Sequence, residues 1–320
     1  MYKVVSLFTG CGGCDQGMVG DFIFNNKYYE KLPYELVYAL DVDQKALNTH
    51  KMNFSCDNVV CGDICDIPSE DIPECDVLIG GFPCQSFSTV NPTKDPFDDR
   101  ANLYKQMARI AKEKKPKVII AENVKGLMTL HKGQIFQKVK EAFESAGYTL
   151  SYKLMNAANY GVPQKRERVI IVGFRNDLDV TYEFPLETNV GNWVPLSVAV
   201  PKLAIEEEKY YFSKRAVEGM KNAKPNMKRG LWQKLDEPCL TVTSHLAKVS
   251  LNSRDPVLLV DPEKELYRRF TPREAARIQS FPEKFEFAGS ETDAYRQIGN
   301  AVPPVLFWHV CNKVASYLQD

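Results

Sequence analysis

The 320-residue sequence predicts an α/β fold, in which a parallel, doubly wound sheet is joined to a smaller, irregular domain. Three observations predict it. Short apolar runs alternate with segments of helical periodicity through the first half of the chain. These runs are almost continuously apolar, which is typical of parallel strands buried on both faces. After about residue 175, prolines, charges and short irregular segments replace the alternation until about residue 270.

The strand candidates are the apolar runs of the first half. They span 3–8, 34–40, 58–62, 76–81, 117–121, 148–155 and 168–174. Helices are expected at 43–54, 102–116 and 134–147, where apolar residues recur at helical spacing. Pro116 and Gly147 stand where the last two of these helices should end.

The tail, 303–319, returns to an amphipathic helical pattern. Its apolar residues need a surface to cover, and the simplest expectation is that this helix packs back onto the first domain. We therefore assign residues 1–185 and 292–320 to the first domain, and residues 186–291 to the smaller domain and its hinge.

Composition indicates a soluble globular protein, with 44% hydrophobic and 26% charged residues. No apolar run approaches the ~20 residues of a membrane span. The N-terminus lacks the features of a signal peptide, so a cytoplasmic protein is expected. The nine cysteines are odd in number, which favours free thiols over a disulfide framework. Cys11 and Cys14 form one CxxC without a second pair or paired histidines, so no metal site is expected.

The formal net charge is zero, but the charge is unevenly distributed. Between Lys209 and Lys234, eight basic residues accompany one acid, Glu218, with aromatic residues among them. Such a stretch is either a nucleic-acid contact or a solvated basic face, and the segment alone leaves both open.

Residues suited to chemistry follow five of the predicted strands. Ligands of open α/β sheets bind at the carboxyl ends of the strands, so these groups are expected along one edge. A glycine-rich loop admits a ligand close to the backbone, and an acid after the second strand suits a ribose. Asp15 occupies the third glycine position of a dinucleotide fingerprint, which favours another nucleoside ligand over NAD. The five groups are Thr9-Gly10-Cys11-Gly12-Gly13, Asp41-Val42-Asp43, Asp63-Ile64, Phe82-Pro83-Cys84 and Glu122-Asn123.

Four side chains are the candidates for catalysis. Pro83 fixes the backbone before Cys84, and a polar segment follows. The thiol is therefore expected to be exposed, as a nucleophile must be. The alternative is a core residue, because most single cysteines are buried. A desolvated carboxyl at Glu122 would keep its proton near neutrality, whereas a helix cap or a paired core acid is the alternative. Arg166 and Arg168 alternate onto one face of an extended segment, which a surface ion-pair ladder would also explain.

Six motifs together carry a resemblance to a known family. They are "FTGCGG", "GGFPCQSFS", "AENVKGL", "QKRERVIIVG", "RRFTPREAARIQSFP" and "YRQIGNAVPP". In this order and spacing they resemble the DNA cytosine-5 methyltransferases, in particular the compact enzymes of bacterial restriction–modification systems. The resemblance covers nearly the whole chain except roughly 176–262. It implies a Rossmann-like methyltransferase domain that uses S-adenosylmethionine, with a smaller target-recognition domain.

The resemblance implies a binding site for S-adenosylmethionine. Asp41 would meet the ribose, and the segment at Asn300 would close the pocket from the C-terminal part of the chain. The residues implied are Phe8, Thr9, Gly10, Cys11, Gly12, Gly13, Asp41, Val42, Asp63, Ile64, Pro83, Leu103, Asn300, Ala301 and Val302.

The resemblance also implies a mechanism. The target cytosine would be flipped out of the duplex, since stacking blocks its ring faces. Cys84 would attack C6 and form a covalent intermediate, and C5 would then take the methyl group. Glu122 would hold N3 and the exocyclic amine, while Arg166 would contact O2 and stabilise the developing charge. Arg168 would orient this group of residues.

DNA contacts are implied in two regions, the segment after the thiol and the smaller domain. The candidates are Gln85, Ser88, Arg100, Arg215, Lys228, Arg229, Thr241 and Thr243. The implied partner is double-stranded DNA, with a cognate restriction endonuclease as a functional rather than physical partner, and a monomer is expected.

Three alternative functions are disfavoured by individual residues or motifs of the sequence. One is a tRNA cytosine-5 methyltransferase, but Phe82 stands where the RNA branch typically has a second proline. Another is a catalytically silent DNA-binding relative. The presence of all four catalytic candidates, Cys84, Glu122, Arg166 and Arg168, disfavours it. An NAD-binding oxidoreductase would leave the Pro-Cys-Gln and Gln-x-Arg-x-Arg motifs unexplained.

Overall fold

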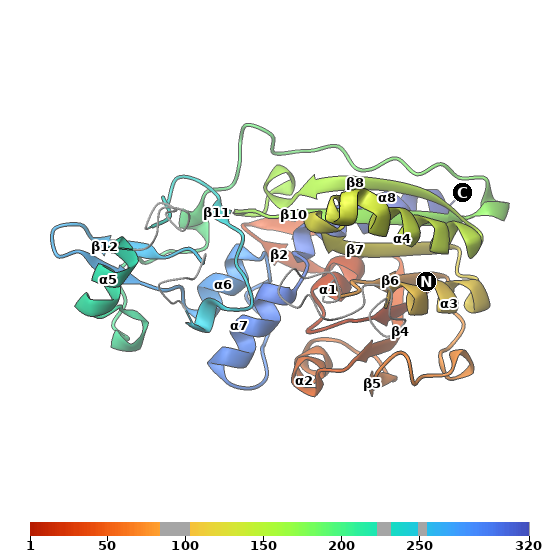
Figure 1. Ribbon diagram of the computed structural model, residues 1–320, viewed down its shortest axis with the longest axis horizontal. Helices are drawn as coiled ribbons and strands as arrows, with labels where there is room; N and C mark the ends of the chain where they lie inside the picture. The colour runs from red at the N-terminus through yellow and green to blue at the C-terminus, as the bar shows by residue number, and fades with distance from the viewer. Residues whose placement is uncertain (84–102, 223–231, 249–254, 320) are drawn as a thin grey trace.

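The computed structural model describes residues 1–83, 103–222, 232–248 and 255–319. Seven strands form its main sheet. They are β1 (Tyr2–Leu7), β4 (Tyr34–Asp41), β5 (Val59–Cys61), β6 (Val77–Gly80), β7 (Val118–Val124), β8 (Tyr148–Asn156) and β10 (Glu167–Arg175). Their order across the sheet is β5-β4-β1-β6-β7-β10-β8 (Figure 1). Each of these strands was predicted from the sequence, and the α/β fold class is confirmed.

One strand departs from the parallel arrangement that we expected. All neighbours from β5 to β7 are parallel, whereas β10 is antiparallel to both β7 and β8. A parallel connection needs a crossover of a dozen or more residues, usually a helix. The link between β8 and β10 holds only a turn at Ala157–Tyr160 and the short strand β9 (Gln164–Lys165). A parallel placement of β10 was therefore wrong.

The sheet is buried on both faces, which explains the continuous apolar runs. Val4 and Val5 are both fully buried, yet they face opposite sides because successive strand residues alternate. Val4 belongs to the core that is covered by α1 (Gly13–Val19) and α8 (Pro304–Leu318). Val5 belongs to the core that is covered by α3 (Tyr104–Lys114) and α4 (Gln134–Ser145). The helix α2 (Gln44–Asn53) follows β4, and Asp43 caps its first turn.

A small hairpin extends the first of these cores. It comprises β2 (Phe22–Phe24) and β3 (Lys27–Tyr29), which the sequence did not predict as strands. Phe22 and Tyr29 stack with ring centroids 4.9 Å apart, and Tyr29 also packs edge-on against Trp308 of α8. The last helix therefore packs on the N-terminal part of the chain, as its apolar face required.

The second half of the chain builds a further core. It is lined by β11 (Cys239–Leu240), β12 (Leu258–Asp261), α6 (Pro272–Ile278) and α7 (Glu291–Asn300), while α5 (Lys214–Lys221) and β13 (Leu266–Arg268) contribute to a smaller, separate cluster. Phe270, Phe281 and Tyr295 lie at the centre of the larger of the two. Figure 1 shows α6 and α7 between the main sheet and the end of the molecule that carries α5 and β12. In the described part of the chain, no helix is long and apolar enough to cross a membrane.

Candidate active site

Four parallel strands end side by side at one edge of the sheet. Leu7 of β1 pairs with Leu40 of β4 on one side and with Gly80 of β6 on the other. Gly80 pairs in turn with Ala121 of β7. The next residue of each strand therefore lies along the same edge, as the sequence led us to expect. These residues are Phe8, Asp41, Gly81 and Glu122.

Because β10 runs antiparallel, its start rather than its end reaches this edge. Arg168 pairs with Val124 and is thus a diagonal neighbour of Glu122, within reach of a long side chain. Arg168 Nε lies 2.8 Å from Glu122 Oε1, and only 12% of each side chain is exposed. Burial raises the pKa of Glu122, although the charges of Arg168 and Arg166 oppose this shift. Burial thus makes the protonated carboxyl easier to reach, while the contact with Arg168 stabilises the carboxylate.

Asn123 holds the start of the segment that leads to Cys84. Its Nδ2 donates to the carbonyl of Phe82 at 2.8 Å, and the residue is 3% exposed. A side-chain carbon on Gly81 would lie 3.2 Å from Oε2 of Glu122. The missing side chain of Gly81 therefore lets the carboxyl lie directly against this segment. Sequence reasoning had given Asn123 no role of its own.

Six of the predicted site residues lie outside the described part of the chain, so their roles stay predictions. They are Cys84, Gln85, Ser88, Arg100, Lys228 and Arg229. Pro83, directly before the thiol, is half-buried. Among the residues that the structure does describe, no three His, Cys, Asp or Glu side chains are placed to hold a metal ion together.

Arg166 is held quite differently from Arg168. It is 1% exposed, and its Nη1 donates to the carbonyl of Val242 at 3.0 Å. Its Nη2 donates to the carbonyls of Gly299 at 3.0 Å and Ala301 at 2.9 Å. Burial lowers the pKa of this guanidinium, but arginine stays protonated in proteins. Our expectation that Arg166 contacts a base does not fit this geometry, because its terminal nitrogens already serve three carbonyls.

Two buried glutamines extend the same junction. Gln164 Oε1 accepts the backbone N–H of Val242 at 2.9 Å, and its Nε2 donates to Gln279 Oε1 at 2.5 Å. Gln279 Nε2 donates to the carbonyls of Ile298 and Ala301, each at 2.8 Å. The segment after β11 is thereby fixed against the active edge, that is, the edge of the sheet at which Phe8, Asp41, Gly81 and Glu122 lie. The glutamine of the Gln-x-Arg-x-Arg motif, Gln164, was the sequence feature from which this junction could have been predicted.

The glycine-rich loop after β1 combines open space with close packing. Phe8 has φ +55°, a left-handed conformation that non-glycine residues rarely adopt and that is often found at functional sites. A side-chain carbon on Gly10 would meet no atom within 4 Å, so this position is open to a ligand. On Gly13 such a carbon would lie 2.5 Å from the carbonyl oxygen of Val302. Only glycine therefore lets the C-terminal segment, with the exposed Asn300, close on the loop.

A buried polar group supports this loop from below. The hydroxyl of Thr9 donates to the carboxylate of Asp15, and His50 Nε2 lies 3.2 Å from Asp15 Oδ2. The side chains of Asp15 and His50 are both fully buried. Gly12 faces Phe54, because a side-chain carbon there would lie 2.3 Å from its ring. Thr9 and Gly12 thus support the loop through contacts inside the protein, and sequence reasoning missed Asp15 and His50 as their partners.

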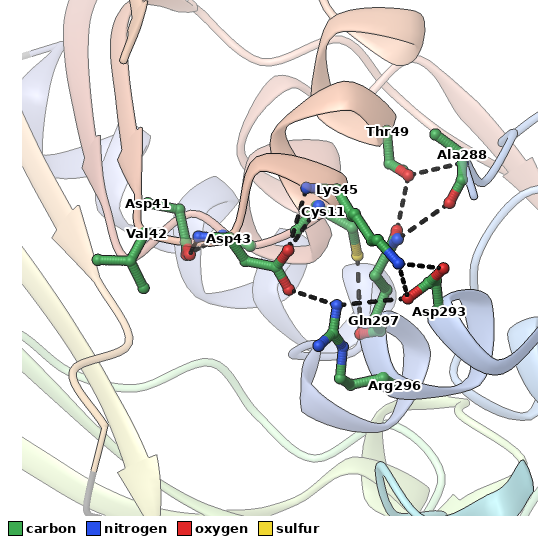
Figure 2. A network of polar contacts seen from close by, with 12 residues as sticks. Cys11, Asp41, Val42, Asp43, Lys45, Thr49, Ala288, Asp293, Arg296 and Gln297 are labelled. Carbon is green, nitrogen blue, oxygen red and sulfur yellow. Dashed lines mark hydrogen bonds and ion pairs between the residues drawn. The ribbon is translucent and has the colours of Figure 1, made fainter. Parts of the chain in front are cut away.

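The acid at the end of β4 is arranged to meet a ribose. Asp41 Oδ2 accepts the N–H of Gly10 at 2.8 Å, and its Oδ1 accepts the N–H of Asp43 at 2.8 Å. Each carboxylate oxygen keeps a further lone pair for a ligand hydroxyl. Burial raises the pKa of Asp41. Val42, beside it in Figure 2, is 69% exposed and offers an apolar surface to a flat ring.

Three further predicted residues follow β5 or precede α3. Asp63 Oδ1 accepts the N–H of Cys65 at 2.9 Å. Ile64 is 3% exposed, and its carbonyl accepts from Arg109 Nη2 at 3.2 Å. Leu103 packs partly buried against the same core as Ile64. The turn after β5, which would border the adenine ring of the cofactor, is therefore anchored by both the core and α3.

The predicted DNA-reading threonines are engaged within the protein. Thr241 Oγ1 donates to the carbonyl of Lys165 at 2.9 Å, and Thr243 Oγ1 donates to Asp255 Oδ1 at 2.7 Å. These bonds shape the segment after β11. Because each hydroxyl has already donated its proton, it can only accept a hydrogen bond from DNA. Arg215, by contrast, is exposed on α5. The structure therefore favours a positioning role for the two threonines over direct contact.

The chain is similar to known proteins over nearly its whole length. A family model described as C-5 cytosine-specific DNA methylase matches residues 2–316. The chain is 36% identical over 327 residues to the type II methyltransferase M.NgoFVII of Neisseria gonorrhoeae, covering 94% of this chain and 83% of that protein. It is 32% identical over 349 residues to the type II methyltransferase M.FnuDI of Fusobacterium nucleatum, covering 99% and 95%.

Solved structures share the fold over the full length. The S. pombe Dnmt2 methyltransferase superposes with a TM-score of 0.77 at 18% identity and covers 100% of this chain and 99% of that one. The Entamoeba histolytica methyltransferase EhMeth gives a TM-score of 0.78 at 19% identity and covers 99% of both chains. At these identities the likeness concerns the architecture alone.

Proposed function

The chain belongs to the C-5 cytosine-specific DNA methylase family, and we propose that it transfers a methyl group from S-adenosylmethionine to C5 of a cytosine flipped out of duplex DNA. One observation carries this proposal. The Glu122–Arg168 pair lies against the segment that leads to Cys84, on the same sheet edge as the glycine-rich loop. Because the relatives are type II methyltransferases, we assign the enzyme to a restriction–modification system, where it would protect DNA from a cognate endonuclease.

The residues at the sheet edge fit S-adenosylmethionine. Gly10 has open space above it, and Asp41 offers carboxylate oxygens to the ribose hydroxyls. Val42 supplies exposed apolar surface for the adenine ring, and Asn300 is exposed where the C-terminal segment meets the loop. The bound cofactor supplies an electrophilic methyl group.

Glu122 prepares the flipped base for attack. In its protonated form, which burial makes easier to reach, the carboxyl donates a hydrogen bond to N3 while the other oxygen accepts from the exocyclic amine. This interaction draws electrons from the ring and makes C6 electrophilic. The thiolate of Cys84 would then add to C6, and C5 would take the methyl group as its bond to the sulfonium sulfur breaks, which leaves S-adenosylhomocysteine. Loss of the C5 proton and departure of the Cys84 thiolate restore the aromatic ring.

The two arginines exchange the roles that the sequence suggested. Arg168 lies against Glu122 with 12% of its side chain exposed, so it is the cation that can reach O2 of a base bound there. Arg166 is a positioning residue, because its guanidinium holds the carbonyls of Val242 and Ala301. This exchange keeps one positive charge at the base and one at the junction with the smaller domain.

The smaller domain, residues 186–291, reads the target sequence in this proposal. Arg215 is an exposed cation on α5, and with Lys228 and Arg229 it would contact the DNA backbone. The junction at Arg166 fixes the segment after β11 next to the active edge. A base selected by this domain is therefore presented to Glu122.

Methyl transfer from labelled S-adenosylmethionine tests the proposal. The full chain should label unmodified bacterial genomic DNA, and sequencing should place 5-methylcytosine at one short recurring site. The matched variant Cys84→Ala should bind DNA but transfer no label. Total tRNA is the comparison substrate: labelling of tRNA alone would move the enzyme to RNA, and labelling of neither nucleic acid would overturn the proposal.

A further inference from the structure

A buried pair of polar side chains joins α2 to α7. Thr49 is fully buried and Gln297 is 4% exposed. The hydroxyl of Thr49 donates to Gln297 Oε1 at 2.6 Å and accepts the backbone N–H of Ala288 at 2.8 Å. Gln297 Nε2 donates to the carbonyl of Ala288 at 3.1 Å (Figure 2). The pair therefore closes a small hydrogen-bonded ring between two helices that are far apart in the sequence.

The same ring reaches the glycine-rich loop. The thiol of Cys11, at the centre of that loop, donates to the backbone carbonyl of Gln297 at 3.7 Å. Burial raises the pKa of Cys11 to about 12, so the thiol keeps its proton and remains a donor. The loop that would hold S-adenosylmethionine thus rests on α7 as well as on β1.

Charged side chains surround this ring on the solvent side. Lys45 Nζ lies 2.9 Å from Asp293 Oδ2, and Arg296 Nη2 lies 2.9 Å from Asp43 Oδ2. Lys45 and Arg296 are 58% and 45% exposed, and exposed ion pairs of this kind contribute little. The N–H of Asp43 also bonds Asp41, which places the ribose carboxylate next to this interface. The buried ring therefore adds to these ion pairs a contact between α2 and α7 that is closed to solvent.

The helix α7 also belongs to the second core. Tyr295 and Ile298 are buried in the core that also contains Phe270 and Phe281. At its end, α7 leads directly to Asn300, where the cofactor pocket would close. A change in how α7 docks on α2 would therefore shift both walls of that pocket, which are the glycine-rich loop and the segment at Asn300.

We propose that Thr49 and Gln297 are positioning residues for the cofactor: their hydrogen bonds dock α7 on α2 and so set the glycine-rich loop and the C-terminal wall in binding position. This inference rests on the proposed use of S-adenosylmethionine. Neither side chain needs to touch the ligand. Each acts through backbone segments that do.

The change Thr49→Val tests the role of the hydroxyl, because valine keeps the shape and removes the donor and acceptor. It leaves Gln297 Oε1 and the N–H of Ala288 buried without their partner, which penalises the docked arrangement. The dissociation constant for S-adenosylhomocysteine, measured by calorimetry on the full chain, should rise about tenfold. The KM for S-adenosylmethionine should rise in parallel, while kcat at saturating cofactor stays close to wild type.

Two control variants separate positioning from general loss of stability. Thr49→Ser keeps the hydroxyl and should bind the cofactor product like the wild type. Tyr148→Phe removes a buried hydroxyl that donates to the carbonyl of Pro116 at 2.8 Å. This tyrosine lies at the start of β8, the outermost strand on the side of the sheet away from β4 and β5. The substitution should lower the melting temperature without changing the dissociation constant.

The outcomes are distinct. Unchanged binding in Thr49→Val, or an equal loss in Tyr148→Phe, would overturn the positioning role while leaving the proposed function intact. A wild-type chain that binds no S-adenosylhomocysteine would overturn the proposed cofactor and the inference together.

Discussion

At the scale of single residues, Arg166 and Arg168 have opposite surroundings although they lie two positions apart. Arg168 forms an ion pair with Glu122, whereas Arg166 donates to three backbone carbonyls. The sequence places both on one extended segment, and its pattern cannot tell which of them is enclosed by the smaller domain. That distinction depends on Val242 and Gly299, which come from distant parts of the chain.

Lysine substitutions should separate these two roles. Arg166→Lys keeps the charge but offers one nitrogen to carbonyls that now receive bonds from two, so the free energy of unfolding should fall by about 2–4 kcal/mol. Arg168→Lys should leave stability nearly unchanged and lower kcat at least about tenfold, because the planar contact with Glu122 and the base is lost. Urea unfolding and single-turnover methylation measure the two effects. Loss of turnover in Arg166→Lys with wild-type stability would contradict the assignment.

At the scale of elements, the end of α7 and the segment after β11 approach each other more closely than any side chain permits. A side-chain carbon on Gly299 would lie 2.2 Å from the backbone nitrogen of Ser244 and from the carbonyl carbon of Thr243. Both neighbours are backbone atoms, which cannot turn aside as a flexible side chain can. The glycine of the "GNAVPP" motif is therefore a packing requirement between two elements.

Gly299→Ala should push these elements apart. We expect a loss of about 1–3 kcal/mol in the free energy of unfolding, together with weaker binding of duplex DNA, because the segment after β11 is displaced from the active edge. Gly126→Ala is the matched control, since the nearest atom to its added carbon is 3.9 Å away. Thermal melts and DNA titrations compare the two variants. Equal behaviour of the two would show that the close approach has no consequence.

Most elements of the main sheet were predicted because their signals are local. The apolar runs, Pro116 and Gly147 mark strands and helices within a few residues of themselves. The helices α6 and α7 were missed, although Thr271 with Glu274 and Ser290 with Asp293 form capping boxes, whose residue spacing is visible in the sequence. The direction of β10 was missed because it follows from chain length between strands rather than from composition.

At the scale of the whole molecule, His309 lies where α8 meets the hairpin and the turn after β8. Its ring packs against Tyr29 and Tyr160 and is 9% exposed. Burial, with help from the charge of Lys27, lowers the pKa of this histidine to about 4 from its ordinary 6.5. Between these values the unfolded chain binds the proton and the folded protein does not, so stability falls as the pH falls.

This histidine should make the fold acid-sensitive. Lowering the pH from 7 to 5 should cost the wild type about 2 kcal/mol more than it costs His309→Leu, because leucine has no proton to bind in either state. Urea unfolding at the two pH values gives the difference directly, and the carboxylates common to both proteins cancel in the comparison. An identical pH dependence for the two proteins would show that His309 does not titrate on unfolding.

The cofactor edge joins the two extremes of the chain, since Gly13 packs against Val302 and α1 against α8. During synthesis the N-terminal strands emerge first, and one face of their sheet stays uncovered until the final helix has been made. We therefore expect affinity for the proposed cofactor to arise in one late step rather than to build up gradually on a growing chain. A product of interrupted translation would hold a nearly complete sheet and yet compete for neither cofactor nor DNA with the finished enzyme.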